Sequence, residues 1–238
     1  IMTNNPANAS TVGHQKQGST SQPFTDALTV KIKDQPLGMR NVQKIGIKNP
    51  GVKIGENYTD YTQGSFRITD NTYDLALAGD GFFAIEFTNK AGETDTKYTR
   101  AGQFTLNKDG YLVTEEGDYV LDTQNRRIRL NTLLDSKITD DGTIYQNDQA
   151  VARIQVTDFE DYDYLEKYGE TYYQPIEGAK TTTADAQVKS GYLEMANVQI
   201  VSEMVNLISI TRAYESNQKV VQTIDGTLDV AANQIGKL

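Results

Sequence analysis

The chain has 238 residues, a net charge of −9, no cysteine and a single histidine, His14. The missing cysteines exclude disulfides and thiolate metal sites, and one histidine argues against a Ser-His-Asp triad or a multi-histidine zinc site. The negative charge argues against general nucleic-acid binding, and no apolar run approaches the ~20 residues that span a bilayer. We therefore expect no catalytic residue, cofactor, metal, nucleic-acid partner or membrane insertion. Apolar residues with Gly make up about 39% of the chain, below the usual ~45–50%, so part of it is expected to be buried by a partner.

The N-terminal quarter is predicted to lack a core of its own. Residues 1–30 are rich in Asn, Ser, Thr and Gln, which predicts a flexible segment in which His14 is incidental rather than a ligand. Residues 31–57 contain short β-type runs broken at Pro36–Gly38 and Asn49–Gly51, which predicts an extended connector. The sequence starts at Ile1 without a signal segment, and we expect that its natural beginning is missing.

Residues 58–185 are predicted to form a β-rich domain. Short apolar runs alternate with turn residues every 10–15 positions, without helical periodicity. Asn107–Gly110 and Asp140–Gly142 are predicted turns between strands, and Gly79–Gly81 is predicted to be the turn of a hairpin.

Residues 190–238 are predicted to form a coiled-coil domain, with its helix running from about Glu194 to Leu238. Apolar residues recur there at alternating steps of three and four, the spacing of a heptad seam. The predicted seam, interrupted by a stutter across residues 212–220, is Val201, Met204, Ile208, Thr211, Val221, Ile224, Leu228, Ala231 and Ile235. At ~1.5 Å per residue such a helix is about 65 Å long, too long to pack on its own domain, so we expect a partner helix. The alternative is an amphipathic helix that lies on its own domain.

Three further patterns contain residue types that can bind ligands or catalyse reactions. The acidic residues of 158–163 lack the spacing of a calcium-binding loop and predict a solvated loop. Arg126, Arg127 and Arg129 fit exposed strand positions, with an anionic partner as the alternative. The tyrosines of 162–173 leave open an extracellular glycan- or peptidoglycan-binding module, and a glycosidase with a Glu/Asp pair is a third, weaker hypothesis.

Several motifs resemble the rod and hook family of bacterial flagellar axial proteins. They are Tyr61–Phe66 with Asn71–Phe83, Tyr98–Val113, and in the last part Gly191–Val198, Arg212–Asn217 and Gln222–Asp225. The motif residues of the β-domain are Gln63, Gly64, Asp74, Leu75, Gly79, Gly81, Phe82, Phe83, Arg100, Gly102, Phe104 and Gly110. The family also has an N-terminal helix, of which only the stretch Thr3–Gly13 is similar, with Pro6 in place of the usual Leu.

The resemblance implies a mainly β fold with α: a compact β-rich domain, a long C-terminal heptad helix and a flexible N-terminal segment. It implies a structural subunit rather than an enzyme, which polymerises helically with other copies of itself. Its partners would be neighbouring rod and hook proteins and the L/P ring proteins, in the basal body of the flagellum, after export without a cleaved signal. The length leaves no room for the large outer domain of hook subunits, which favours a rod protein, most like the distal one; a proximal rod or hook subunit is the alternative.

Overall fold

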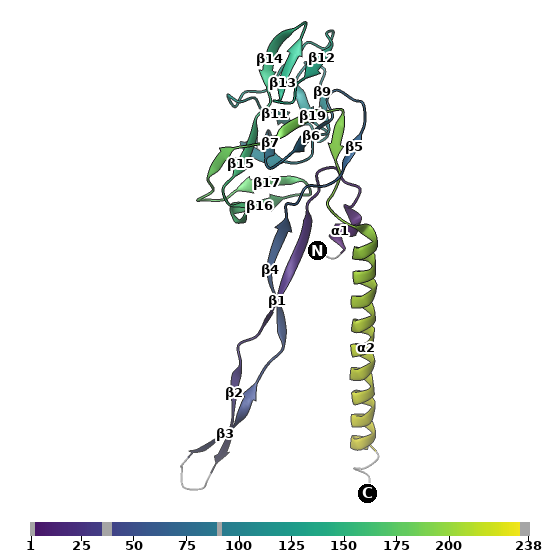
Figure 1. The fold of residues 1–238 in the computed structure, drawn as a ribbon. Coiled ribbons are helices and arrows are strands. Elements are labelled where there is room, and N and C mark those ends of the chain that lie inside the picture. The colour runs from purple at the N-terminus through teal and green to yellow at the C-terminus, as the bar shows by residue number, and fades with distance from the viewer. Residues whose placement is uncertain (1–2, 35–39, 90–91, 234–238) are drawn as a thin grey trace. The chain divides into compact units, whose positions relative to one another are not determined.

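A computed structural model describes residues 3–34, 40–89 and 92–233, and Figure 1 shows their fold. It is mainly β with one long C-terminal helix, which confirms the predicted fold class. The described residues divide into two compact units, one within 17–60 and a larger one within 3–16 and 61–233.

The smaller unit is a ribbon of two successive strand pairs. Its strands are β1 (Lys16–Pro23), β2 (Ala27–Asp34), β3 (Arg40–Lys48) and β4 (Val52–Asp60). β1 pairs with β4, and β2 pairs with β3 from Ala27↔Lys48 to Asp34↔Arg40. The sequence predicts a flexible segment for residues 1–30 and an extended connector for residues 31–57. The paired strands of this ribbon therefore differ from the prediction. The predicted break at Pro36–Gly38 lies outside the described residues.

The larger unit is built on a sheet that has nine strands within the described residues. Its order is β16-β17-β8-β7-β11-β10-β9, and β15 pairs with both β7 and β18. The strands are β7 (Phe82–Thr88), β8 (Thr94–Thr99), β9 (Phe104–Leu106), β10 (Leu112–Thr114), β11 (Tyr119–Val120), β15 (Val156–Phe159), β16 (Leu165–Tyr168), β17 (Tyr172–Pro175) and β18 (Thr181–Thr183). A short 3-10 helix at Tyr162–Tyr164 precedes β16.

Smaller sheets complete this unit. β12 (Ser136–Ile138), β13 (Thr143–Gln146) and β14 (Gln149–Arg153) form an antiparallel meander. β6 (Leu75–Ala78) pairs with β19 (Gln187–Ser190), and β5 (Phe66–Ile68) pairs with β20 (Tyr192–Glu194). Through the last two pairs, residues 187–194 lie beside residues 66–78.

The core lies on both faces of β7. Successive side chains of a strand point to opposite faces, so the fully buried neighbours Phe82 and Phe83 enter different clusters. Phe83 packs in a cluster with Leu75, Phe104 and Ile144, and Phe82 packs in a second, aromatic cluster with Tyr173. Two apolar layers thus hold this unit together without any residue of the C-terminal helix.

Two turns match the sequence prediction and one does not. Asn107–Gly110 joins β9 to β10, and residues 140–142 join β12 to β13. Gly79–Gly81 is not a hairpin turn, because β6 pairs with β19 while β7 pairs with β8, β11 and β15. The turn instead carries the chain from one sheet to another.

The helices are α1 (Asn4–Ala7) and α2 (Ile200–Asn233). α2 begins later than the predicted Glu194, because β20 holds residues 192–194 in the pair with β5. At ~1.5 Å per residue, its 34 described residues extend about 50 Å. No helix among the residues that the structure describes is long and apolar enough to cross a membrane.

Candidate functional site: the C-terminal helix and its anchor

α2 exposes its large apolar side chains along almost its whole length. Of its described residues, Glu203 alone is buried and Leu207 is half-buried. Among the predicted seam residues, Ile224 is 51% and Leu228 60% exposed, and Val201, Met204, Ile208 and Val221 are exposed as well. The region of the helix that the sequence marks as a packing surface is therefore largely open to solvent within the described chain.

The predicted seam does not form a single line on this helix. α2 is uninterrupted from Ile200 to Asn233, and an α-helix turns by about 100° per residue. The mean direction of the group Val201–Thr211 then differs by roughly 160° from that of the group Val221–Ala231. In place of a stutter in one seam, the helix has two apolar faces.

The second group belongs to a longer seam in unbroken heptad register. Stepping back from Val221 by four and three residues leads through Tyr214 and Ile210 to Leu207 and Glu203. We name this line the helix seam: Glu203, Leu207, Ile210, Tyr214, Asn217, Val221, Ile224, Leu228 and Ala231. Ile235 continues the spacing but lies outside the described residues. The two residues of α2 that are not exposed are its first two members, so this is the side of the helix that already has a neighbour.

The neighbour is the N-terminal segment of the same unit. Lys16 Nζ lies 2.8 Å from Glu203 Oε1, and this bond is the main cause that lowers the pKa of Glu203. The backbone N–H of Lys16 donates to Asn197 Oδ1 at 2.6 Å. α1 contacts α2, and Ala9 packs in a small apolar cluster with Ala196 and Val198. The start of the seam is thus fixed by residues 4–16.

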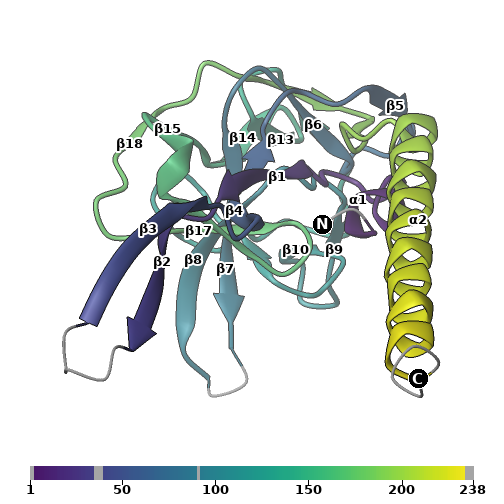
Figure 2. The same cartoon turned by 90° about the horizontal axis from the view of Figure 1, so that it is seen from below.

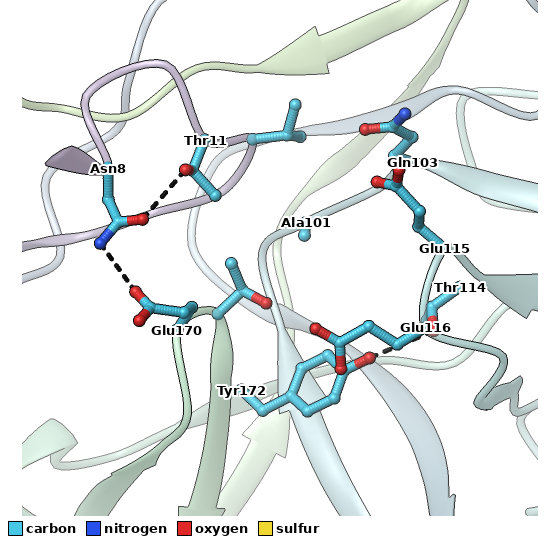
Figure 3. A pocket seen from close by; sticks show the side chains of 11 residues that line it. Asn8, Thr11, Ala101, Gln103, Thr114, Glu115, Glu116, Glu170 and Tyr172 are labelled. Atoms are coloured by element: carbon cyan, nitrogen blue, oxygen red, sulfur yellow. Dashed lines mark hydrogen bonds between the residues drawn. The ribbon is translucent and has the colours of Figure 1, made fainter.

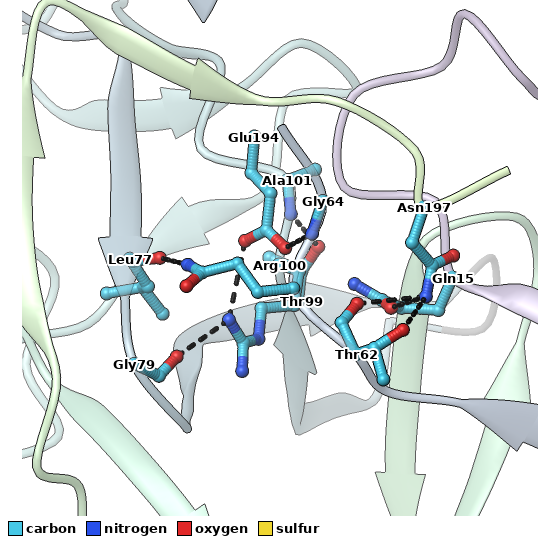
Figure 4. A network of polar contacts seen from close by, with 11 residues as sticks. Gln15, Thr62, Gly64, Leu77, Gly79, Thr99, Arg100, Ala101, Glu194 and Asn197 are labelled. Atoms are coloured by element: carbon cyan, nitrogen blue, oxygen red, sulfur yellow. Dashed lines mark hydrogen bonds and ion pairs between the residues drawn. The ribbon is translucent and has the colours of Figure 1, made fainter. Parts of the chain in front are cut away.

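A buried ion pair fixes the strand that leads into α2, as Figure 4 shows. Arg100 Nη1 lies 3.3 Å from Glu194 Oε2 and donates to the carbonyl of Gly79 at 2.9 Å, and both charged side chains are inaccessible to solvent. Glu194 also accepts from the backbone N–H of Gly64 at 3.0 Å. Burial raises the pKa of Glu194, and the Arg100 guanidinium opposes that shift. The pair joins β20 to the loops before β5 and β7.

Most motif residues of the β-domain are buried, whereas Gln63 is exposed and Gly64 and Gly79 are half-buried. Gln63 donates to the carbonyl of Leu77, and Leu75 donates to the carbonyl of Gly102 at 2.9 Å. A Cβ on Gly102 would lie 1.7 Å from Leu75 O, one on Gly64 1.8 Å from Met195 O, and one on Gly110 2.3 Å from Leu130 O. These glycines permit close backbone approach, so the motif specifies the fold of the domain that carries α2.

His14 is buried, contrary to the prediction of a flexible segment. Its side chain is inaccessible and neither ring nitrogen makes a hydrogen bond of ordinary geometry. Burial, with the Lys167 ammonium nearby, lowers the pKa of His14, and the backbone and carboxylate of Glu170 act in the opposite direction. The Nζ of Lys167 is also buried without a hydrogen-bond partner, and burial lowers the pKa of Lys167. No periodic pattern in residues 1–30 signals this burial.

A pocket of about 340 Å³ beside the N-terminal segment is acidic (Figure 3). Glu115, Glu116 and Glu170 line it, and Asn8 Nδ2 donates to Glu170 at 2.7 Å. The Tyr172 hydroxyl donates to Asp118 at 2.9 Å. Within residues 3–34, 40–89 and 92–233, no three His, Cys, Asp or Glu side chains are placed to hold a metal ion.

The other polar patterns of the sequence have structural partners. Tyr162 packs on Tyr61 and donates to Asp158 at 2.7 Å, and Tyr172 and Tyr173 are buried, so the tyrosines of 162–173 do not form one contact face. Arg127 pairs with Glu86 and stacks over Tyr119, and Arg129 lies over Tyr111.

Comparison with known proteins assigns this architecture to a class. The profile described as "Flagellar hook protein FlgE/F/G D1 domain" matches residues 76–146, and the profile described as "Flagellar basal body rod FlgEFG protein C-terminal" matches residues 189–235. The first covers the strands around β7, and the second covers β19, β20 and α2. The chain therefore combines the β-domain and the helical end that define flagellar axial proteins.

Individual relatives cover nearly the whole chain. It is 32% identical to the flagellar basal-body rod protein FlgG of Bacillus subtilis, over 98% of this chain and 91% of the relative. It is 32% identical to the rod protein FlgF of Caulobacter vibrioides, over 100% and 90%. It is 28% identical to the flagellar hook-basal body complex protein FlhO of Bacillus subtilis, over 100% and 93%. The chain belongs to the family of flagellar basal-body rod proteins.

Proposed function

We propose that the chain is a structural subunit of the flagellar basal-body rod and that it assembles by burying the helix seam. The observation that carries the proposal is the exposure of Ile224 and Leu228, at 51% and 60%, in a seam whose first members are already packed. An exposed apolar line of this length is unfavourable in water, and heptad pairing with another helix removes it from solvent.

In the assembled rod, copies stack helically and their C-terminal helices pack together, while the β-rich units carry the outer contacts. Repetition of one heterologous contact builds an open helical polymer, which transmits torque from the motor to the hook. Neighbouring rod and hook proteins, and the L/P ring proteins, are its other partners. The subunit reaches the basal body by export without a cleaved signal, and its role is structural rather than enzymatic.

Its position within the rod stays a prediction. Relatives named FlgG and FlgF match the chain at the same identity of 32%, so identity does not favour one over the other. The distal rod remains the position that we propose.

The test replaces Ile224 by Glu in the bacterium that produces the chain. A carboxylate in a heptad seam must be desolvated on pairing, which costs several kcal/mol. We expect loss of motility and absence of the chain from isolated basal bodies. Because Ile224 belongs to neither core cluster, thermal unfolding of the β-region in the purified full chain should be unchanged.

The matched control is Val230→Glu, the same change at a valine that is 47% exposed on the other side of the same helix. This variant should assemble and swim. Normal rods from the Ile224→Glu strain would show that the seam is not the assembly surface.

A further inference from the structure

An open groove of about 540 Å³ is lined by residues of β8, β15 and β18 and by none of α2. β15 and β18 lie side by side (Figure 2) and are paired along their length. Residues of the turn at 123–125 also line the groove. Of its ten lining residues six are threonines, and we name it the threonine groove; the others include Tyr98, Asn125 and Gln155.

The lining of the threonine groove carries no charge. None of its ten residues is Asp, Glu, Lys, Arg or His, although 23% of the chain is charged. Three other pockets of the same unit are each lined by at least three charged side chains. An ionic group bound in the threonine groove would lose water without meeting an opposite charge, so the groove favours a neutral ligand.

The groove that adjoins it disfavours anions in particular. The two share Thr123 and Thr183, and the second also contains three aspartates and one arginine. Nε of that arginine, Arg153, donates to the carbonyl of Asp141 at 3.0 Å. A negatively charged ligand that extends beyond the threonine groove therefore meets mainly carboxylates.

The threonine groove presents hydroxyl and amide groups that the chain itself does not use. Thr157 and Thr183 are directly opposite in the ladder of β15 and β18, so their side chains point to the same face. Thr96 and Tyr98 are two residues apart on β8 and also share a face. Within the part of the chain that the structure describes, no lining side chain makes a hydrogen bond with another residue. Each hydroxyl can therefore both donate to and accept from a ligand.

Gln155 adds a buried acceptor to this lining. Its backbone is held on both sides, because Gln155 N donates to the carbonyl of Leu121 at 3.0 Å and Ala84 N donates to the carbonyl of Gln155 at 3.1 Å. Its Oε1 is buried and has no hydrogen-bond partner among the described residues. A buried acceptor without a donor is unfavourable, and a ligand hydroxyl or N–H in the groove would satisfy it.

We propose that the threonine groove binds a neutral saccharide. Saccharide hydroxyls both donate and accept, so they pair with the threonine hydroxyls and with the amide of Gln155. An apolar ligand would leave these groups unpaired. The volume of the groove lies within the ~300–1,000 Å³ of small-ligand sites. The site does not depend on assembly, because all its lining residues belong to the larger unit of one chain.

The experiment titrates the isotope-labelled full chain with two neutral tetrasaccharides, cellotetraose and N-acetylchitotetraose, and follows its amide NMR signals. Titration to about 10 mM fills most of a site with a dissociation constant of about 1 mM. We expect saturable shifts at residues 96–98, 123–125, 155–157 and 181–183 and at the side-chain amide of Gln155, from at least one of the two. Tetragalacturonate, an anionic tetrasaccharide, should bind at least tenfold more weakly.

Two variants test the lining. Gln155→Met removes the amide at nearly constant volume, and Thr183→Val removes a hydroxyl but keeps the β-branched shape. Each should weaken saccharide binding at least fivefold. The matched control is Thr105→Val, the same change at an exposed threonine of β9 outside the groove, which should bind as the wild type does.

Three results would overturn the proposal: no saturable shift with either neutral saccharide, shifts confined to residues outside the threonine groove, or equal binding of tetragalacturonate. Unchanged affinity in both Gln155→Met and Thr183→Val would overturn it as well. If one variant fails to fold, the shifts of the wild-type chain and the other variant still decide. None of these results bears on the helix seam, so the proposed function stands or falls separately.

Discussion

At the scale of single residues, the least expected feature is the neighbourhood of His14. A buried imidazole beside the buried ammonium of Lys167 is stable only while the imidazole is neutral, because a second positive charge there would be desolvated and repelled. His14 lies two residues before Lys16, which pairs with Glu203 at the start of the helix seam. We therefore expect protonation of His14 to weaken the anchor of α2.

The first prediction concerns pH. The pKa of His14 is lowered in the folded chain, so the unfolded chain takes up the proton first as pH falls. The contribution of neutral His14 to the free energy of unfolding is therefore complete above the ordinary histidine pKa of about 6.5 and declines as the pH falls below it. Thermal unfolding between pH 7.5 and 5.5 should show this decline, and His14→Leu should remove most of it. Since the chain has one histidine, its NMR titration should have a midpoint below 6.5.

A second prediction concerns the motif glycines. Gly102→Ala places a Cβ 1.7 Å from Leu75 O, in backbone that is held by the bond from Leu75 N to Gly102 O. We expect a loss of about 1–3 kcal/mol in the free energy of unfolding, measured with urea. Gly226→Ala is the control, because its Cβ meets no atom within 4 Å and Ala favours helix. Equal stability of both variants would contradict the packing role of Gly102.

At the scale of elements, α2 depends on partners for most of its stability. Its N-terminal end is held through Glu203, Leu207 and α1, and from Ile208 onward its described side chains are exposed. Helical propensity alone leaves a helix marginal in water. The exposed helix seam therefore has consequences for the isolated monomer as well as for the polymer.

The third prediction follows for hydrogen exchange in dilute monomer. Amides of α2 after Ile208 should exchange at least tenfold faster than those of β7, whose residues Phe82–Ile85 are fully buried. Assembly should slow the exchange of the helix and leave that of β7 unchanged. Slow, uniform protection along the whole helix in the monomer would mean that α2 is stable without partners.

At the scale of the whole molecule, the chain consists of two units with very different cores. The larger unit has two apolar clusters on either side of β7. The ribbon exposes Leu28, Ile47, Val52 and Ile54, and a two-stranded ribbon alone is marginally stable. Its stability is thus expected to be independent of that of the larger unit.

The fourth prediction is that brief proteolysis of the monomer cuts within Gln17–Asp60 before it cuts β6–β20. The larger unit should keep its melting temperature within about 2 °C after such a cut, because its clusters contain no residue of the ribbon. Differential scanning calorimetry of the nicked chain makes the measurement. Collapse of the larger unit on nicking would show that the two units fold as one.

Turns depend on neighbouring residues and could be predicted from the sequence, whereas pairings between distant strands could not. The turns Asn107–Gly110 and Asp140–Gly142 were predictable, because each ends in a glycine, which readily adopts the positive φ that the turn requires. The pairing of β6 with β19 joins residues more than a hundred positions apart, and no local pattern encodes it. The hairpin predicted at Gly79–Gly81 failed for that reason.

The mainly β class, the C-terminal helix and an apolar surface that needs a partner could be predicted from the sequence, because they follow from composition and local periodicity. Tertiary structure decided which face of α2 is already occupied, because the buried Glu203 sets the register that runs from Leu207 to Ala231. It also decided that His14 is interior and that Arg100 meets Glu194, since both depend on segments that meet only in the folded chain.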